Sequence, residues 1–246
     1  PISGMDLILT EVKGQVALMT LNRPKELNAL NRQLLEDLSE TLSRLKEDSK
    51  LRVLIITGAG DRAFVAGADI GEMADMDRNQ AEMFARFGNR VMNQIHYFPL
   101  PVIAAVNGFA LGGGFELALA CDLRLASDKA SFAFPETGLG ITPGFGGTQR
   151  LARQTGPMTA FDLIMTGRRI KAQEAKDLGL VLDVIPADLL LDRAWDLASS
   201  IAQKAPVAIR EAKRAIRDGL DLTLTEGLTL EEVAFGCCFE TQDQKK

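Results

Sequence analysis

The sequence has little of the chemistry that builds metal sites or disulfide frameworks. It contains one histidine, His96, and three cysteines, Cys121, Cys237 and Cys238, the last two adjacent. An odd set of cysteines without metal-ligand spacing favours reduced thiols over disulfides, as in proteins of reducing compartments. We therefore expect a cytoplasmic protein with no bound metal.

An excess of charge of one sign is also lacking. The chain has 28 basic and 33 acidic residues, a net charge of −5, and no long basic run. A nucleic-acid partner is not expected, because binding to a phosphate backbone requires clustered positive charge. Asn107, Glu116 and Asp122 interrupt the longest apolar runs before the length that a bilayer requires. No membrane span is expected either.

The chain does have enough apolar residues for a substantial core. Its 246 residues are 46% hydrophobic, which suits one large domain or a domain with an appendage. Residues 1–5 look like a remnant before a natural start at Met5. We expect a sheet-bearing core over residues 6–185 and a helical C-terminal region over residues 186–246.

Strand signals occur mainly in the first half of the chain. Lys13-Gly14 joins two β-rich runs in the manner of a hairpin. Continuous apolar runs follow, which are typical of strands buried on both faces. The expected strands lie at residues 7–12, 15–21, 53–56, 102–106, 123–126 and 181–185.

Helical periodicity alternates with these strands and then dominates. Leucines from Leu34 to Leu45 mark one face of a helix that Asn28 or Asn31 could cap. This alternation indicates an α/β fold with crossover connections. The other expected helices lie at residues 79–97, 148–154, 157–166, 172–178, 190–203, 206–218 and 223–239.

The stretch 103–151 carries the clearest chemical signals. Its two glycine-rich turns, residues 112–114 and 144–147, each precede a predicted helix, and each lies near one glutamate, Glu116 or Glu136. Both glutamates have apolar neighbours, so both should be at least partly buried. A buried carboxylate is costly unless it is paired, hydrogen-bonded or protonated, which makes both candidates for acid or base chemistry.

Each of these features also has a purely structural interpretation. The turn at 112–114 could expose N–H groups to an anion or oxyanion, or could simply allow a helix to pack closely on another backbone. Glu116 could neutralise a buried arginine or cap its helix, and Glu136 could bind nearby loop amides. Asp69, beside the turn at residues 66–69, could be a local cap. Neither the dinucleotide-binding fingerprint nor a phosphate-binding loop is present.

Several segments together resemble the enoyl-CoA hydratase (crotonase) superfamily, most closely its short-chain enoyl-CoA hydratases, or 3-hydroxybutyryl-CoA dehydratases. The resemblance spans most of the chain. It is carried by residues 21–24 and 27–30 (LNRP, LNAL), 64–70 (FVAGADI), 101–122, 135–151, 205–208 and 240–245.

The resemblance implies a crotonase-like spiral of β-β-α units with a helical C-terminal trimerisation region, assembled as a homotrimer or a dimer of trimers. It also implies an acyl-CoA substrate and no separate cofactor. In the family, two backbone N–H groups form an oxyanion hole for the thioester carbonyl, and the matching positions here are Ala68 and Gly113.

The same resemblance assigns the chemistry to the two glutamates. By likeness to hydratases, Glu116 would be the base toward water and Glu136 the acid toward Cα in the reversible hydration of 2-enoyl-CoA. Two carboxylates that share one water and one proton can perform both transfers. The implied substrate-binding residues are Ala66, Asp69, Ile70, Met73, Phe134 and Gly144.

The chain departs from the family pattern in three places. Phe134 replaces a usual glutamine before Pro135-Glu136, and Phe115 replaces a smaller residue, so both could reshape the acyl pocket. The chain also ends at Lys246, where relatives usually continue into a last helix. The alternatives are therefore an enoyl-CoA isomerase, a hydratase of cyclic dienoyl-CoA, or a catalytically silent binding protein with this fold.

Overall fold

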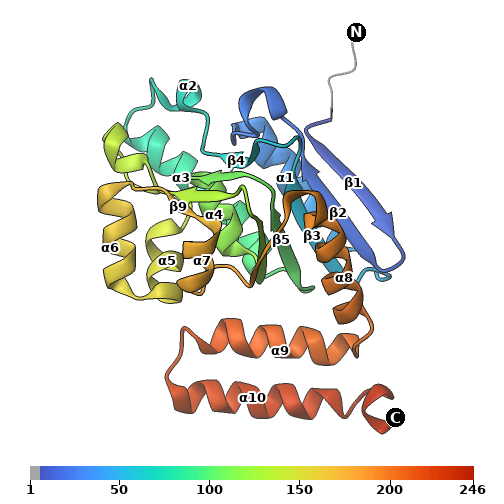
Figure 1. The fold of residues 1–246 in the computed structure, drawn as a ribbon. Helices are drawn as coiled ribbons and strands as arrows, with labels where there is room; N and C mark the ends of the chain where they lie inside the picture. Colours follow the sequence, from blue (N-terminus) through green and yellow to red (C-terminus); the bar gives the residue numbers. More distant parts are fainter. Residues whose placement is uncertain (1–5) are drawn as a thin grey trace.

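Two β-sheets form the centre of the fold, and helices pack around them (Figure 1). The computed structural model describes residues 6–246, so the expected remnant at residues 1–5 lies outside the described part. The α/β class expected from the alternation of strands and helices is confirmed.

The larger sheet contains all six strands that were predicted from the sequence. β1 and β2 form the expected antiparallel hairpin, and the remaining neighbours pair in parallel. Every residue of β3 is buried, as its uninterrupted apolar run predicts. In spatial order the strands are β1 (Ile8–Lys13), β2 (Val16–Leu21), β3 (Val53–Gly58), β5 (Val102–Val106), β7 (Leu123–Ser127) and β10 (Asp183–Ile185).

The smaller sheet was not predicted from the sequence, and its strands are two to four residues long. β4, β6 and β8 pair in parallel, and β9 closes the sheet antiparallel to β8. Parallel β4 and β6 end at the same edge, so the glycine turns that follow them meet there. In spatial order the strands are β4 (Ala63–Ala66), β6 (Phe109–Leu111), β8 (Ser131–Ala133) and β9 (Ile170–Lys171).

Helix α1 (Arg32–Lys46) begins at Asn31, one of the two expected caps. The Asn31 side chain accepts the N–H of the third helical residue at 2.8 Å. Asn28 has a different function, since its fully buried amide donates to the carbonyls of Ala59 and Ala63, both at 3.0 Å. It therefore ties the segment before α1 to the ends of β3 and β4.

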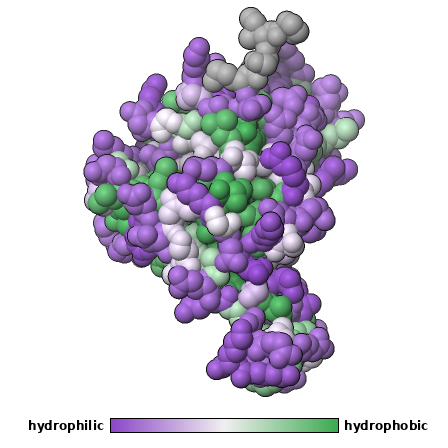
Figure 2. All heavy atoms as spheres, turned by 90° about the vertical axis from the view of Figure 1, so that its right-hand side faces the viewer, coloured by the Kyte–Doolittle hydropathy of each residue, from purple (hydrophilic) through white to green (hydrophobic). Residues whose placement is uncertain are grey.

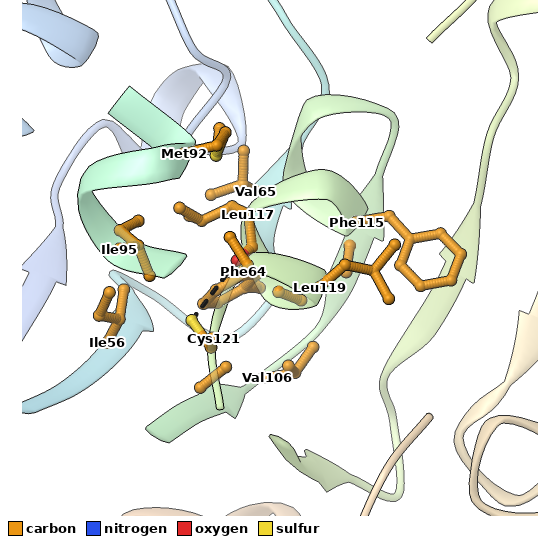
Figure 3. Close-up of a cluster of buried hydrophobic side chains, with 14 of the residues drawn as sticks. Ile56, Phe64, Val65, Met92, Ile95, Val106, Phe115, Leu117, Leu119 and Cys121 are labelled. Atoms are coloured by element: carbon orange, nitrogen blue, oxygen red, sulfur yellow. Dashed lines mark hydrogen bonds between the residues drawn. The ribbon is translucent and has the colours of Figure 1, made fainter. Parts of the chain in front are cut away.

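Helix α4 (Gly113–Ala120) lies at the centre of the core, and every one of its residues is buried (Figure 3). A helix that is apolar all round is stable only inside such a core. Gly114 allows the close packing, because a Cβ at this position would collide with the Val65 carbonyl of β4. Glu116 is the single ionisable residue on this helix.

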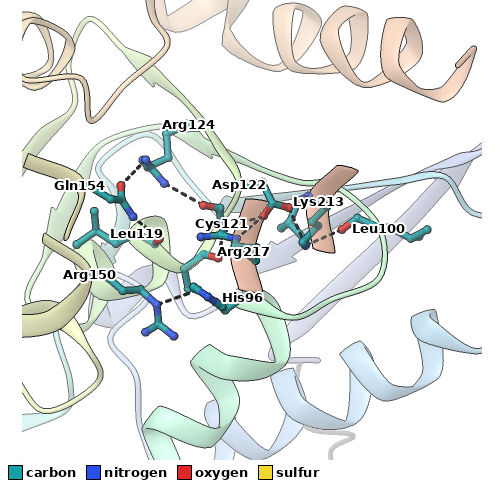
Figure 4. A network of polar contacts seen from close by, with 12 residues as sticks. His96, Leu100, Leu119, Cys121, Asp122, Arg124, Arg150, Gln154, Lys213 and Arg217 are labelled. Carbon is teal, nitrogen blue, oxygen red and sulfur yellow. Dashed lines mark hydrogen bonds and ion pairs between the residues drawn. The ribbon is translucent and has the colours of Figure 1, made fainter. Parts of the chain in front are cut away.

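Side chains from other parts of the chain satisfy the last carbonyls of α4 (Figure 4). Arg124 is buried and donates to Ala118 and Cys121 at 3.2 and 2.9 Å. Gln154 donates to Leu119 at 3.1 Å, and Arg217 donates to Ala120 at 3.2 Å. Two guanidinium groups thus lie at the negative end of the helix dipole.

The predicted C-terminal helices are all present, with shorter helices between the strands. The helices not yet bounded are η1 (Pro24–Glu26), α2 (Ile70–Met73), α3 (Arg78–His96), η2 (Glu136–Leu139), α5 (Gly147–Thr155), α6 (Pro157–Thr166), α7 (Ala172–Asp177), η3 (Ala187–Leu189), α8 (Leu190–Ala202), α9 (Pro206–Gly219), α10 (Leu224–Cys238) and η4 (Asp243–Lys245). No helix within the described residues combines the length and the hydropathy needed to cross a bilayer.

The helices after residue 185 behave in two ways. α8 packs on the larger sheet against β2, β3, β5 and β7, whereas α9 and α10 project from the body as a pair (Figures 1 and 2). Lys213 and Arg217 of α9 anchor the pair through ion pairs with Asp122 at 2.8 and 2.7 Å. The predicted boundary at residue 185, between the core and the C-terminal helical region, stays a prediction. The first helix after it, α8, still packs on the core, and only α9 and α10 project from it.

Replacing Gly114 by alanine should destabilise the fold. The added methyl group must displace either α4 or the β4 backbone, which costs about 1–3 kcal/mol in a packed core. Urea unfolding followed by circular dichroism measures the free energy. Gly138→Ala is the matched control, because its Cβ would meet nothing within 4 Å. Equal stabilities for the two variants would contradict the close approach.

Candidate active site

A cavity of about 810 Å³ opens at the edge where β4 and β6 end. Its walls are mostly apolar and come from α2, α3, the start of α4, η2 and the turn before α5. The lining residues are Ala66, Gly67, Ala68, Ile70, Met73, Met76, Ala81, Glu82, Phe84, Ala85, Leu111, Gly112, Gly113, Glu116, Pro135, Glu136, Thr137, Leu139, Gly140, Ile141, Thr142, Gly144 and Phe145.

Glu116 reaches this cavity from the first turn of α4, and the turn that leads into α5 binds its side chain. Oε2 accepts the N–H groups of Phe145 and Gly147, both at 2.7 Å. Gly147 is the first residue of α5, so the carboxylate also lies at the positive end of a helix dipole. Burial raises the pKa of Glu116, the nearby Glu136 adds to this, and the two N–H donors oppose it.

Glu136 lies at the start of η2 and is also buried, with 8% of its surface exposed. A Cβ at Gly112 would lie 2.6 Å from Oε1, so only glycine fits beside this carboxylate. Oε2 is buried without a hydrogen-bond partner among the described residues. Burial is the main cause that raises the pKa of Glu136. A carboxyl group in this state holds its proton more readily than a solvated one.

Two backbone N–H groups are available at the same cavity. Leu30 pairs with the strand-like segment around Ala68: its N–H donates to Gly67, and its carbonyl accepts the N–H of Asp69, both at 2.8 Å. In such parallel pairing the N–H of the intervening residue, Ala68, points away from Leu30. The Gly113 N–H is at the first position of α4, where no intrahelical acceptor exists.

The Ala68 and Gly113 backbones lie next to each other. A Cβ at Gly113 would be 3.7 Å from the Ala68 nitrogen. Arg23 holds the Ala68 loop by pairing with Asp69 at 3.0 Å and by donating to the carbonyl of Ala29 at 3.0 Å. Hydrogen bonding to Arg23 lowers the pKa of Asp69. Two N–H donors are thus available side by side for one oxygen atom.

The structure brings most of the predicted site residues to this cavity. The predicted site residues that line it are Ala66, Ala68, Ile70, Met73, Gly113, Glu116, Glu136 and Gly144. Asp69 and Phe134 are not among the lining residues. Asp69 instead caps α2 and pairs with Arg23, as the local-cap interpretation expected. Glu116 does not pair with a buried arginine, because the buried Arg124 binds carbonyls at the other end of α4.

The prediction that Phe134 lines the pocket is corrected by its position. Its side chain is fully buried and stacks on Phe115 with ring centroids 4.6 Å apart. A Cβ at Gly147 would lie 2.7 Å from the Phe134 ring, so the ring packs directly against the glycine that binds Glu116. Phe134 and Phe115 therefore support the wall of the site from behind.

The residues that the sequence did not indicate are mainly apolar wall residues. Phe84 and Ala85 come from α3, which the sequence predicted as a helix but not as part of a site. The rings of Phe84 and Phe145 meet edge to face, with centroids 5.4 Å apart. Gly88 of α3 leaves room for the Phe145 ring. A glycine inside a predicted helix was the one feature of the sequence that could have indicated this close contact.

The fold and the cavity together define an α/β protein in which two buried carboxylates and the backbones of Ala68 and Gly113 line one apolar pocket. Within residues 6–246, no cluster of three or more histidine, cysteine or acidic residues could hold a metal ion. The three cysteines are free thiols.

Comparison with known proteins identifies the family. The model of the Enoyl-CoA hydratase/isomerase family matches residues 11–246, and the chain belongs to this family. It is 48% identical to the short-chain-enoyl-CoA hydratase of Clostridium acetobutylicum, covering 97% of this chain and 91% of that protein. It is 45% identical to the crotonyl-CoA hydratase of Syntrophomonas wolfei, covering 97% and 92%.

Solved structures agree with this assignment. The enoyl-CoA hydratase of Bacillus anthracis superposes with a TM-score of 0.94 at 44% identity, covering 97% of this chain and 93% of that chain. The crotonase fold expected from the resemblance is confirmed.

Phe134→Leu should lower stability, because it removes a stacked ring from the core. Loss of part of a buried aromatic side chain costs on the order of 1–3 kcal/mol in unfolding free energy, measurable by urea titration. Leu139→Ala is the control, since Leu139 lines the cavity and is 55% exposed. Its effect should stay within about 0.5 kcal/mol. A fully stable Phe134→Leu protein would mean that Phe134 is not a packing residue.

Proposed function

We propose that this protein catalyses the reversible syn hydration of short-chain trans-2-enoyl-CoA to 3-hydroxyacyl-CoA. The single observation that carries the proposal is the convergence of Glu116, Glu136 and the backbones of Ala68 and Gly113 on one apolar cavity. The names of the relatives from Clostridium acetobutylicum and Syntrophomonas wolfei support this reaction and a short acyl chain.

The two N–H donors would bind the thioester oxygen. Addition of water to Cβ moves electron density toward this oxygen, so an enolate develops in the transition state. The N–H groups of Ala68 and Gly113 would stabilise that charge in a cavity with apolar walls. Preorganised donors of this kind are worth roughly 3–4 kcal/mol each in enzymes that use them.

Burial raises the pKa of Glu116 to about 8 and that of Glu136 to about 7, so these values do not separate the roles of the two glutamates, whereas their hydrogen bonds do. Glu116 receives two short N–H hydrogen bonds and lies at a helix N-terminus, which favours the carboxylate. Glu136 has a buried oxygen without a partner among the described residues, which favours the acid. Glu116 would therefore take a proton from water while Glu136 delivers one to Cα, and dehydration reverses both roles.

These groups supply the acid, the base and the oxyanion donors that the reaction needs, so the proposal includes no separate metal or redox cofactor. The substrate carries its own coenzyme A. The free thiols of Cys121, Cys237 and Cys238 support a location in the reducing cytoplasm.

Assembly into a homotrimer or a dimer of trimers is part of the same proposal. Large apolar side chains are exposed on α6, on α9, on α10 and at the ends of these helices. They are Met158, Phe161, Met165, Ile216, Leu220, Leu222, Leu224, Leu228, Val233, Phe235 and Phe239. Exposed apolar side chains on packed helices are typical of subunit interfaces.

Glu136→Gln tests the reaction and the role of the acid together. The amide cannot deliver a proton, so the rate of crotonyl-CoA hydration should fall by about 10²–10⁴-fold. The rate is measured as the loss of the enoyl absorbance. Binding of a saturated acyl-CoA, measured by calorimetry, should change little. Near-normal turnover would contradict the two-carboxylate mechanism. Failure of the wild-type protein to hydrate linear or cyclic enoyl-CoA substrates would contradict the proposed function itself.

Light scattering should show a trimer or a hexamer for the wild-type protein. Phe235→Ser removes an exposed ring of α10 and should shift the mass distribution toward smaller species at low concentration. Val12→Ser is the control, because Val12 is exposed like Phe235 but lies on β1 instead of α10. A wild-type monomer at every concentration would contradict the assembly.

A further inference from the structure

A second, polar cavity of about 480 Å³ lies behind the turn that binds Glu116. Residues of α3, α5 and α9 surround it, and the turn residue Gly144 lines both this cavity and the one that contains the two glutamates. The turn at residues 144–147 is thus a thin wall between them. Arg150 of α5 is the charged residue that touches this wall from behind.

Arg150 connects the turn to helix α3. Its Nε donates to Nδ1 of His96 at 3.2 Å (Figure 4). Its Nη2 donates to Oδ1 of Asn93 at 2.8 Å. Its Nη1 lies 3.5 Å from the Phe145 carbonyl. A Cβ at Gly146 would collide with Nη1, so the guanidinium also lies directly on the turn backbone.

Glu116 is bound on the opposite side of the same turn. The residue whose carbonyl faces Arg150, Phe145, donates its own N–H to Glu116 at 2.7 Å. Gly147 provides the second N–H of the pair. A shift of the turn backbone would therefore move both donors relative to the Glu116 carboxylate.

The side-chain hydrogen-bond partners of Arg150 within the described residues are all neutral. His96 is uncharged at physiological pH, because burial and the nearby Arg217, Arg150 and Lys213 lower its pKa to about 3. Burial likewise lowers the pKa of Arg150. No carboxylate within residues 6–246 forms an ion pair with this guanidinium, and its field acts on Glu116 across the turn.

The charged and titratable groups around Glu116 and Arg150 come from η2, from α5, from α9 and from the C-terminal ends of α3 and α4. Glu136 of η2 and Arg150 of α5 face Glu116. Arg217 of α9, Tyr97 and Cys121 act electrostatically on Arg150, and His96, Arg153 and Asp221 line the same cavity. The field of Glu136 raises the pKa of Glu116 and the field of Arg150 lowers it.

We propose that Arg150 is a positioning residue that, from outside the active-site cavity, holds the 144–147 turn and its two N–H donors in place against the Glu116 carboxylate. Its catalytic consequence rests on the proposed role of Glu116 as the base. Without the guanidinium, the turn loses its hydrogen-bonded link to α3, and the Glu116 carboxylate loses the positive charge of Arg150 behind the turn.

Arg150→Gln should raise the pKa of Glu116. This can be measured without any activity by ¹³C NMR of protein labelled at the glutamate carboxyl carbons, with the Glu116 signal assigned from its absence in Glu116→Gln. Arg150→Lys keeps the charge and should shift the titration less than Arg150→Gln does. Arg153→Gln is the matched control on α5, and its Glu116 titration should equal that of the wild type.

An unchanged Glu116 titration in a folded Arg150→Gln protein would overturn the proposal. A shift in Arg150→Lys as large as that in Arg150→Gln, or an equal shift in Arg153→Gln, would overturn it too. These outcomes are independent of turnover, so they remain decisive even if the wild-type protein proves unable to hydrate enoyl-CoA.

The pH profile of hydration provides the catalytic readout. A base must be deprotonated to act, so a higher Glu116 pKa moves the acid limb of kcat/KM to higher pH. The loss in Arg150→Gln should therefore grow as the pH falls, by about tenfold for each unit of pKa shift below the limb. A loss of equal size at every pH would show only a structural role and would overturn the proposal.

Discussion

The two hydrogen bonds from the Phe145 and Gly147 N–H groups to Glu116 are the constraint on which the site depends. They bring the start of α5 to the start of α4 and hold a costly buried carboxylate between them. The arrangement is crossed: Glu116, which follows the first glycine turn, is bound by the second turn, and Glu136 lies beside Gly112 of the first. Each turn thus contacts the glutamate that lies farther from it in sequence.

The parallel pairing of β4 with β6 explains why the N–H donors and the carboxylates share one cavity. Both strands end at the same edge of the smaller sheet, so Ala68 and Gly113 become neighbours although a long helix separates them in sequence. The ion pair between Arg23 and Asp69 then holds the Ala68 loop from the solvent side. Sheet topology sets the positions, and a few polar contacts fix the orientations.

Elements with a helical period or a continuous apolar run could be predicted from the sequence, and the strands of the smaller sheet could not. The period of α3 and the buried run of β3 extend over enough residues to define their type. The smaller sheet has strands of only two to four residues, and its pairing is entirely non-local. The glutamates were recognisable as buried acids, but their separate roles came from the family resemblance. Phe134 shows the limit, because composition alone cannot tell a pocket wall from the packing behind it.

The capping of α4 links the active site to the order in which the chain is made. This helix carries Glu116 and Gly113, yet its last carbonyls depend on Arg124, Gln154 and Arg217. During synthesis from the N-terminus, these groups emerge after the helix, and the last of them comes from α9. A nascent chain that has completed both sheets still lacks part of what stabilises its central helix. Part of what stabilises the helix that carries Glu116 and Gly113 therefore becomes available only once α9 has been synthesised.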